Sequence, residues 1–236
     1  MLPDYLIAVD LGQTTDYTAI AVAERRVLPT GRQEEVTNLA AYWSGGDGSP
    51  PLLRQPQRAS HYDLVHLERV PLGTPYTELP GRLRAIEDRV RRRWVELVWE
   101  RSARAAYADE APVVTVVDQT GVGRPVVDLL REAGIDPVAI TNTGGDQVVR
   151  VAPGEWRVPK RNLAGVVQVL LQTRRLRWAK DLAEAATLRA ELENFKARIS
   201  LTGHDSYAAG EDWRENRHDD LVLSVALGCW YGEAGR

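Results

Sequence analysis

Cysteine and long apolar runs are scarce in this sequence, and their scarcity excludes several classes of protein. Among 236 residues there is one cysteine, Cys229, so an internal disulfide is impossible and a reducing compartment is expected. No stretch approaches the roughly 18 uninterrupted apolar residues that a membrane-spanning helix needs. Residues 1–10 lack the basic start and the small-residue cleavage site of a signal peptide. We therefore expect a cytoplasmic protein that makes no contact with a membrane.

A strong net charge is also absent. The chain carries 30 Lys and Arg residues against 33 Asp and Glu residues, which gives a formal net charge of −3. A charge of this size exerts no overall attraction on nucleic acid. Arginine is clustered at residues 89–93 and 174–177, but such runs are typical of solvated helix faces. The charge balance alone therefore does not identify a partner.

The apolar runs follow an order that is typical of an α/β fold. Residues 5–11 and 17–23 predict two strands joined by a short turn, and residues 62–70 predict a third strand. The runs VVTVV and PVAIT are continuous and apolar, as in strands buried within a parallel sheet. Helices are expected at residues 86–101, 125–133, 160–174, 182–196 and 218–231, and a further strand at 197–201. The prediction is a mixed central sheet, with three leading antiparallel strands followed by parallel strands, flanked by helices.

Two segments interrupt this pattern, although we expect residues 1–236 to form a single domain. Residues 24–60 show no periodicity and include the glycine- and proline-rich stretch SGGDGSPP, so they predict a loop-rich insertion, with room for a short strand or helix inside it. Residues 147–159 predict a hairpin that turns at Pro153 and Gly154.

Acidic residues stand at the ends of apolar runs that are far apart in the sequence. Asp10 ends LIAVD, Asp118 ends VVTVVD, and the pair Asp219 and Asp220 opens the last predicted helix. Open α/β sheets collect their ligands at the carboxyl ends of their strands. Carboxylates that converge there would form an all-oxygen site suited to Mg²⁺ or Mn²⁺. Asp16, across the first turn from Asp10, is either a further ligand or a turn-capping residue.

Each of these carboxylates has a simpler explanation when it is taken alone. An aspartate at a strand end often forms a turn, and two aspartates at a helix start often cap that helix. Together, on three separate elements, they favour a site for two divalent ions. Such ions, about 3.5 to 4 Å apart, activate water and stabilise the leaving oxygen in phosphodiester hydrolysis. The pattern therefore predicts a metal-dependent nuclease.

Several segments of the sequence form a recognisable set: AVDLGQTTDYTAIAV, VVDQTGVGRPVVDLL, ITNTGGD, VPKRNL and NRHDDLVLSVALG. Together they resemble the nuclease domain of phage terminase large subunits, which belongs to the RNase H-like superfamily. The resemblance covers most of the chain, with residues 24–60 as the clearest departure. It implies an RNase H-like fold and an endonuclease that cuts concatemeric double-stranded viral DNA during genome packaging.

The resemblance also implies roles for the acidic residues. Asp10, Asp118 and Asp220 would be the catalytic ligands of two Mg²⁺ or Mn²⁺ ions, with Asp219 and Asp16 in support. Asp220 is preferred over Asp219 because it directly precedes the apolar run of the helix.

A phosphate-binding Gly-Lys-Ser or Gly-Lys-Thr motif occurs nowhere in the sequence. The ATPase domain of a complete large terminase is therefore missing from it. We expect an isolated nuclease domain, a stand-alone relative, or the partner of a separate packaging ATPase, with the portal and the small terminase as further partners.

Four basic residues are candidates for contacts with the DNA backbone. Lys160 and Arg161 stand at a predicted strand-to-helix junction, and Arg150 and Arg157 lie in the predicted hairpin. Contacts with phosphates position a protein on DNA without reading its sequence. An exposed helix start and an ordinary edge hairpin are the simpler explanations.

Three other functions remain open from the sequence. A Holliday-junction resolvase shares the fold and the acidic cluster, but resolvases are smaller and dimeric. An ATPase lobe similar to actin or the sugar kinases would explain the match of residues 10–14 to Asp-x-Gly-x-Thr, a phosphate-cradling turn. That class needs two lobes, which exceeds this length, and leaves Asp219 and Asp220 unexplained. The third is a catalytically inactive DNA-docking module, which would tolerate Asn or Ala at the acidic positions.

Overall fold

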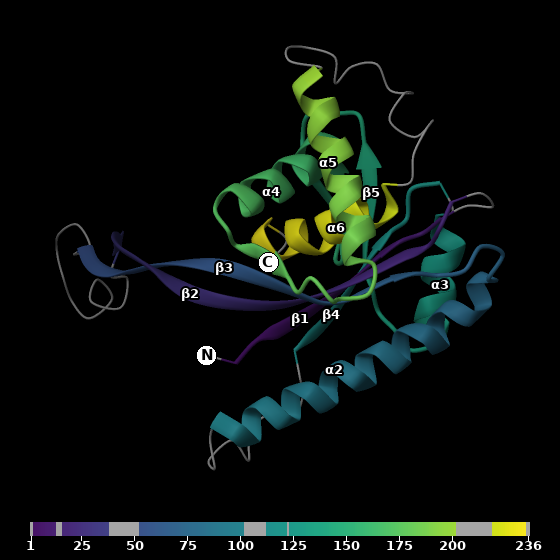
Figure 1. The fold of residues 1–236 in the computed structure, drawn as a ribbon, viewed down its shortest axis with the longest axis horizontal. Coiled ribbons are helices and arrows are strands. Elements are labelled where there is room, and N and C mark those ends of the chain that lie inside the picture. The colour runs from purple at the N-terminus through teal and green to yellow at the C-terminus, as the bar shows by residue number, and fades with distance from the viewer. Residues whose placement is uncertain are drawn as a thin grey trace.

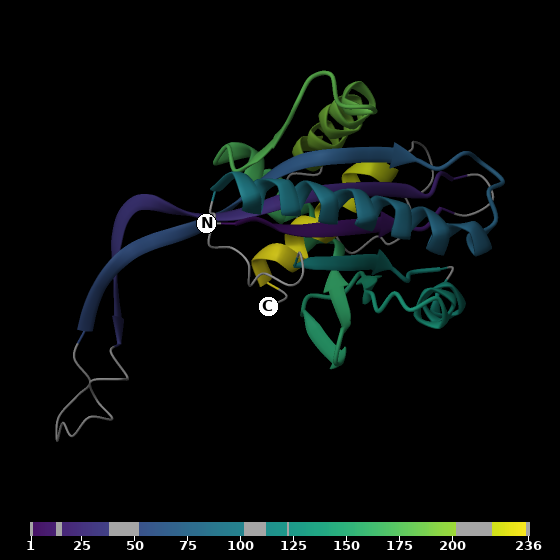
Figure 2. The same cartoon turned by 90° about the horizontal axis from the view of Figure 1, so that it is seen from below.

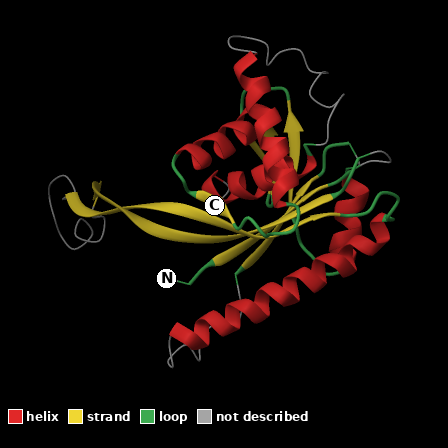
Figure 3. Cartoon of the chain, viewed as in Figure 1, coloured by secondary structure: helices red, strands yellow, loops and turns green. Residues whose placement is uncertain are grey.

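The computed structural model describes residues 2–12, 16–37, 52–101, 112–121, 123–201 and 219–234. Within these ranges, eight strands form one mixed sheet with helices on both of its faces (Figures 1 and 3). The strand order is β6-β7-β5-β4-β1-β2-β3-β8. The predicted mixed α/β architecture is therefore confirmed.

The first three strands pair antiparallel, as expected: β1 (Asp4–Asp10), β2 (Ala19–Thr37) and β3 (Leu52–Arg69). On the other side of β1 lie three strands parallel to it: β4 (Val113–Asp118), β5 (Val138–Thr143) and β7 (Glu155–Pro159). β6 (Val149–Ala152) pairs antiparallel with β7 and forms the hairpin expected at residues 147–159. The sequence did not predict β8 (Leu176–Trp178), a three-residue strand parallel to β3.

The helices are divided between the two faces (Figure 1). One face carries α2 (Leu79–Arg101), which follows η1 (Tyr76–Glu78), and α3 (Arg124–Glu132). The other carries α4 (Lys160–Gln172), α5 (Ala185–Leu201) and α6 (Asp220–Ala234). The strand predicted at 197–201 is wrong, because α5 continues through these residues without a glycine or proline to end it. Of the described helices, none is long and apolar enough to cross a membrane.

The sheet separates two apolar cores, and β1 contributes to both. Its side chains alternate, so that Leu6 and Ala8 pack under α6 while Ile7 and Val9 pack against α2. Helix α6 is apolar on nearly all sides because it is buried along most of its length. Cys229 belongs to this helix and is completely buried, and burial raises the pKa of its thiol, so it is a packing residue.

The loop-rich insertion predicted at residues 24–60 is wrong for the part that the structure describes. β2 and β3 continue past the sheet as a two-stranded arm, paired from Arg26 and His61 out to Thr37 and Leu52 (Figure 2). Most of the described side chains of the arm are exposed, so its strands lack the alternation that a half-buried strand shows. A register shift between Pro29 and residue 33 also breaks the pattern. Residues 38–51, which include the SGGDGSP stretch, lie outside the described residues.

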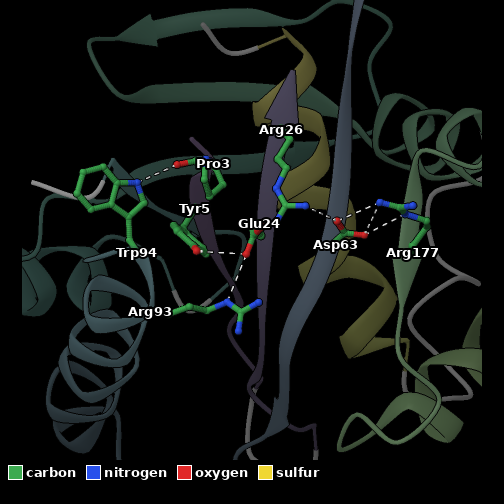
Figure 4. A network of polar contacts seen from close by, with 8 residues as sticks. All are labelled: Pro3, Tyr5, Glu24, Arg26, Asp63, Arg93, Trp94 and Arg177. Atoms are coloured by element: carbon green, nitrogen blue, oxygen red, sulfur yellow. Dashed lines mark hydrogen bonds and ion pairs between the residues drawn. The ribbon is translucent and has the colours of Figure 1, made fainter. Parts of the chain in front are cut away.

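A buried carboxylate connects β2 to its neighbours on the α2 face. Figure 4 shows Glu24 of β2 between Tyr5 of β1 and Arg93 of α2. The hydroxyl of Tyr5 donates to Glu24 at 3.2 Å, and Nε of Arg93 donates at 3.4 Å. Arg26 pairs with the same carboxylate and lies 3.8 Å from Asp63 of β3. Because Glu24 is only 1% exposed, these partners compensate for the cost of burying its charge.

Close packing of α6 on the sheet makes a prediction about stability. A Cβ added to Gly232 would lie 2.5 Å from the buried hydroxyl of Tyr62 and 3.0 Å from Leu6. Gly232→Ala should therefore destabilise the fold by about 1–3 kcal/mol in chemical denaturation, as overpacking does. Gly165→Ala in α4 is the matched control, since nothing lies within 4 Å of its added Cβ. That variant should gain about 1 kcal/mol from helix propensity, and equal stability of the two variants would contradict the packing of α6 described here.

Candidate functional site

Two buried carboxylates lie side by side at the end of the sheet where β1 and β4 finish, which we call the acidic end. The parallel pairing of Val9 with Val117 makes Asp10 and Asp118 the next residues on adjacent strands. Alternation places both side chains on the α6 face, the face that Ala8 occupies. Asp10 is 9% exposed and Asp118 is 3% exposed. The structure therefore brings together the first two predicted ligands.

Helix α6 carries the third carboxylate to the same place. A Cβ on Gly228 would lie 3.2 Å from Ala8, and one on Gly232 would lie 3.0 Å from Leu6, so α6 runs against the direction of β1. Its first residue, Asp220, is therefore directed to the acidic end of the sheet, and this side chain is 9% exposed.

Asp219 and Asp220 have different positions at the start of α6. Asp219 precedes the helix, and its carbonyl accepts a hydrogen bond from the N–H of Leu223 at 2.9 Å. It is half-buried, whereas Asp220 is buried. The greater burial of Asp220 favours it as the main ligand, and the helix N-terminus favours negative charge at both positions.

Asp118 is held in place by Thr120, which follows β4, and by Asn142, which lies near the end of β5. The backbone N–H of Thr120 donates to its Oδ1 at 2.7 Å, and Nδ2 of Asn142 donates to its Oδ2 at 2.6 Å. The N–H of Asn142 in turn donates to the hydroxyl of Thr120 at 2.7 Å. Asn142 was not among the residues predicted from the sequence, although its polar side chain near the end of a buried strand was a usable signal.

The turn after Asp10 depends on Gly12. A Cβ at this position would overlap the backbone of Asp16 and Tyr17, so only glycine fits. The hydroxyl of Tyr76 donates to the carbonyl of Gly12. The pKa of Tyr76 is raised, first by burial and then by the negative charge of Asp10. Asp16 lies across this turn and is exposed, so it is not part of the buried cluster.

A fourth acidic residue, Glu191 of α5, lies beside the start of α6 and was missed from the sequence. Its side chain is 5% exposed, and its Oε2 accepts a hydrogen bond from the N–H of Val222 at 3.0 Å. Burial raises the pKa of Glu191 to about 8, and the charges of Asp220 and Asp219 act in the same direction. The signal was a glutamate on the core face of a helix, one residue before the buried Leu192.

Arg69 of β3 is a positive residue at the same end of the sheet. It pairs in register with Ala19, as Asp10 does from the other side of β2. Nε of Arg69 donates to Glu184 at 3.2 Å, and its guanidinium carbon lies 4.8 Å from the ring centre of Tyr17. Arg69 also opposes the rise in the pKa of Glu191, which places its charge near that carboxylate.

The predicted DNA contacts fall in two places. Lys160 begins α4 directly after β7, and the parallel pairing of β5 with β7 places it toward the acidic end. Arg161 forms an ion pair with Asp146, in which Nη1 lies 2.6 Å from Oδ1. On the hairpin, the guanidinium carbon of Arg150 lies 5.4 Å from the ring centre of Trp156. Arg157 is exposed on β7. The backbone position of Lys160 thus lies at the end of the sheet where the carboxylates stand.

The donor atoms suit a hard divalent cation, but their present arrangement does not form a coordination shell. Within the described residues, no group of three His, Cys, Asp or Glu side chains is arranged to hold a metal ion. Two buried oxygens beside the carboxylates, Oδ1 of Asn142 and Oε1 of Glu191, have no hydrogen-bond partner among the described atoms. Oxygen ligands of this kind are those that Mg²⁺ and Mn²⁺ prefer, so the residues fit such an ion chemically.

The strand order and the carboxylates at the acidic end define the RNase H-like class of domain. Residues 80–227 match the family model of the terminase RNaseH-like domain, and the chain belongs to that family. The match runs from α2 into α6 and includes Asp118 and Asp220. This family membership confirms the resemblance found in the sequence.

Among solved structures, the chain is similar to one titled "Crystal structure of the large terminase nuclease from thermophilic phage G20c". The identity is 16% and the TM-score is 0.46, over 98% of this chain and 82% of that chain. No curated protein matches the sequence.

The raised pKa of Glu191 predicts how stability depends on pH without metal. The folded protein holds a proton on Glu191 between the ordinary value of 4.5 and about 8, whereas the unfolded chain loses it. The contribution of Glu191 to stability therefore falls as the pH rises through this window. In EDTA, the melting temperature of Glu191→Gln minus that of wild type should increase as the pH rises from 5 to 8. Glu193→Gln, an exposed position on α5, should track wild type, and parallel curves for all three would contradict the burial of Glu191.

Proposed function

We propose that this chain is a Mg²⁺- or Mn²⁺-dependent endonuclease that hydrolyses phosphodiester bonds of double-stranded DNA during viral genome packaging. One observation carries the proposal. Three buried carboxylates, Asp10, Asp118 and Asp220, come from β1, β4 and α6 and lie at one end of the sheet. Burying several carboxylates together is costly without a counter-charge, so the arrangement favours cations as its partner. Membership of the terminase RNaseH-like family supports the same conclusion.

The residues divide into ligands and supports. Asp10, Asp118 and Asp220 would hold two ions, with Asp219 beside them and the exposed Asp16 orienting water. When bound, divalent ions supply an activated water and stabilise the charge on the phosphate and the leaving oxygen. The contacts of Thr120 and Asn142 fix the orientation of Asp118, as outer-shell partners do for metal ligands.

DNA binding is assigned to the basic residues around the acidic end. Lys160 would contact a phosphate close to the cleaved bond, while Arg161, Arg150 and Arg157 would contact the backbone further along. Such contacts carry no sequence information, so we expect cleavage at many sequences. By family, the partners would be a separate packaging ATPase, the portal and the small terminase, in the cytoplasm of a bacterial host.

The family favours a terminase nuclease over a resolvase or an ATPase lobe. The inactive DNA-docking module is the alternative with an observation behind it. Both oxygens of Asp118 are engaged in hydrogen bonds, and the described carboxylates do not form a metal shell. Cleavage assays separate this alternative from the nuclease.

Cleavage of supercoiled plasmid tests the proposed activity. Wild-type protein should nick the plasmid with Mg²⁺ or Mn²⁺ and leave it intact in EDTA. Asp118→Asn and Asp10→Asn should lose more than the roughly 10–100-fold that removal of an outer-shell partner costs. Asp136→Asn, the same change at a position that is 94% exposed, should cut like wild type.

Two results would contradict the nuclease. Equal cutting by wild type and Asp118→Asn would show that the ligands are assigned wrongly. Binding of DNA without cutting, with either ion and with the packaging ATPase added, would favour the docking module.

Lys160→Ala tests the DNA contact, measured by fluorescence anisotropy in the Asp118→Asn background so that the DNA is not cut. Loss of one phosphate contact should weaken binding to all sequences about equally and lower the slope of log K against log salt by about 1. Arg92→Ala on α2, an exposed position on the opposite face of the sheet, is the control and should bind normally. A loss that is confined to one DNA sequence would overturn the assignment of Lys160 to a phosphate.

A further inference from the structure

Glu191 is a buried carboxylate that lies outside the set of predicted ligands. It projects from α5 on the side that carries Leu188 and Leu192, both of which belong to the core under α6. Only 5% of its surface is exposed. A carboxylate in an apolar core is expensive, so each of its oxygens needs a partner.

One oxygen has a structural role. The first N–H groups of a helix have no partner within that helix, and Oε2 of Glu191 accepts one of them, the N–H of Val222. Val222 is in the first turn of α6, two residues after Asp220. Glu191 thus ties the start of α6, and with it Asp220, to α5.

The other oxygen is not explained by this contact. Oε1 is buried and has no hydrogen-bond partner among the described atoms. The charged groups near it are mostly negative, since Asp220 and Asp219 act on Glu191 while Arg69 is already paired with Glu184 at 3.2 Å. A buried oxygen without a donor, next to two more carboxylates, is the environment that a divalent cation stabilises.

We propose that Glu191 is a fourth carboxylate of the cation site, with Oε2 holding the first turn of α6 and Oε1 taking part in binding a divalent ion beside Asp220. This role rests on the proposed nuclease function. It also explains why a core position of α5 carries an acid, because an apolar residue there could neither hold the turn nor bind the ion.

Binding of Mn²⁺ measured by isothermal titration calorimetry tests the role directly and needs no DNA. Glu191→Gln preserves the shape and still offers an oxygen to the N–H of Val222, while it removes the carboxyl group that can ionise when a cation binds. We expect Mn²⁺ to bind at least about 10-fold more weakly to this variant, and the gain in melting temperature on adding Mn²⁺ to shrink. Glu193→Gln, two residues along α5 and 66% exposed, should bind Mn²⁺ like wild type.

The outcomes separate this inference from the proposed function. If wild type binds Mn²⁺, Asp118→Asn loses it and Glu191→Gln keeps it, Glu191 is only a helix cap and the inference fails while the nuclease stands. If wild type binds no Mn²⁺ or Asp118→Asn binds it normally, the proposed function fails as well. Failure of Glu191→Gln to fold without metal would also overturn the inference, because the carboxyl group would then serve the fold alone.

Discussion

Parallel pairing between β1 and β4 joins the first strand of the chain to one that begins more than a hundred residues later. Both strands lie in the middle of the sheet and are covered on each face by an apolar core. Their register makes Asp10 and Asp118 neighbours on one face. A shift of one residue would turn either side chain to the opposite face, toward α2. The candidate site therefore depends on the apolar side chains that maintain this register.

Helix α6 and its contacts determine where the remaining acidic residues lie. Gly228 and Gly232 let the helix approach β1 closely, and this approach directs Asp220 to the end of the strand. Glu191 then holds the first turn through Val222. The burial of this helix is thus connected to the chemistry at its start. Any change in its distance from the sheet or in its rotation about its own axis would move the carboxylate of Asp220.

The prediction was poorest where a segment has no apolar partner. Beyond the sheet, the described parts of β2 and β3 pair with each other, and the exposed arm carries polar residues on both faces. Backbone hydrogen bonds hold such a ribbon together, and they leave no periodic trace in the sequence. The strand predicted at residues 197–201 was wrong for a different reason. A short mixed run of apolar and polar residues fits a strand and the end of a helix equally well.

The sequence by itself determined the order of the buried strands and of the helices, and the acidic residues at their ends, because buried strands must be apolar and a polar residue that ends one is conspicuous. The exposed arm and the three-residue strand β8 were not among these elements. It also carried the resemblance that the family match confirms. Only the tertiary structure decided which residues surround those carboxylates. Asn142, Glu191 and Arg69 reach the acidic end from β5, α5 and β3, and the order of strands and the packing of helices determine those contacts. Local sequence patterns encode the elements, whereas contacts between distant elements depend on how their apolar faces fit together.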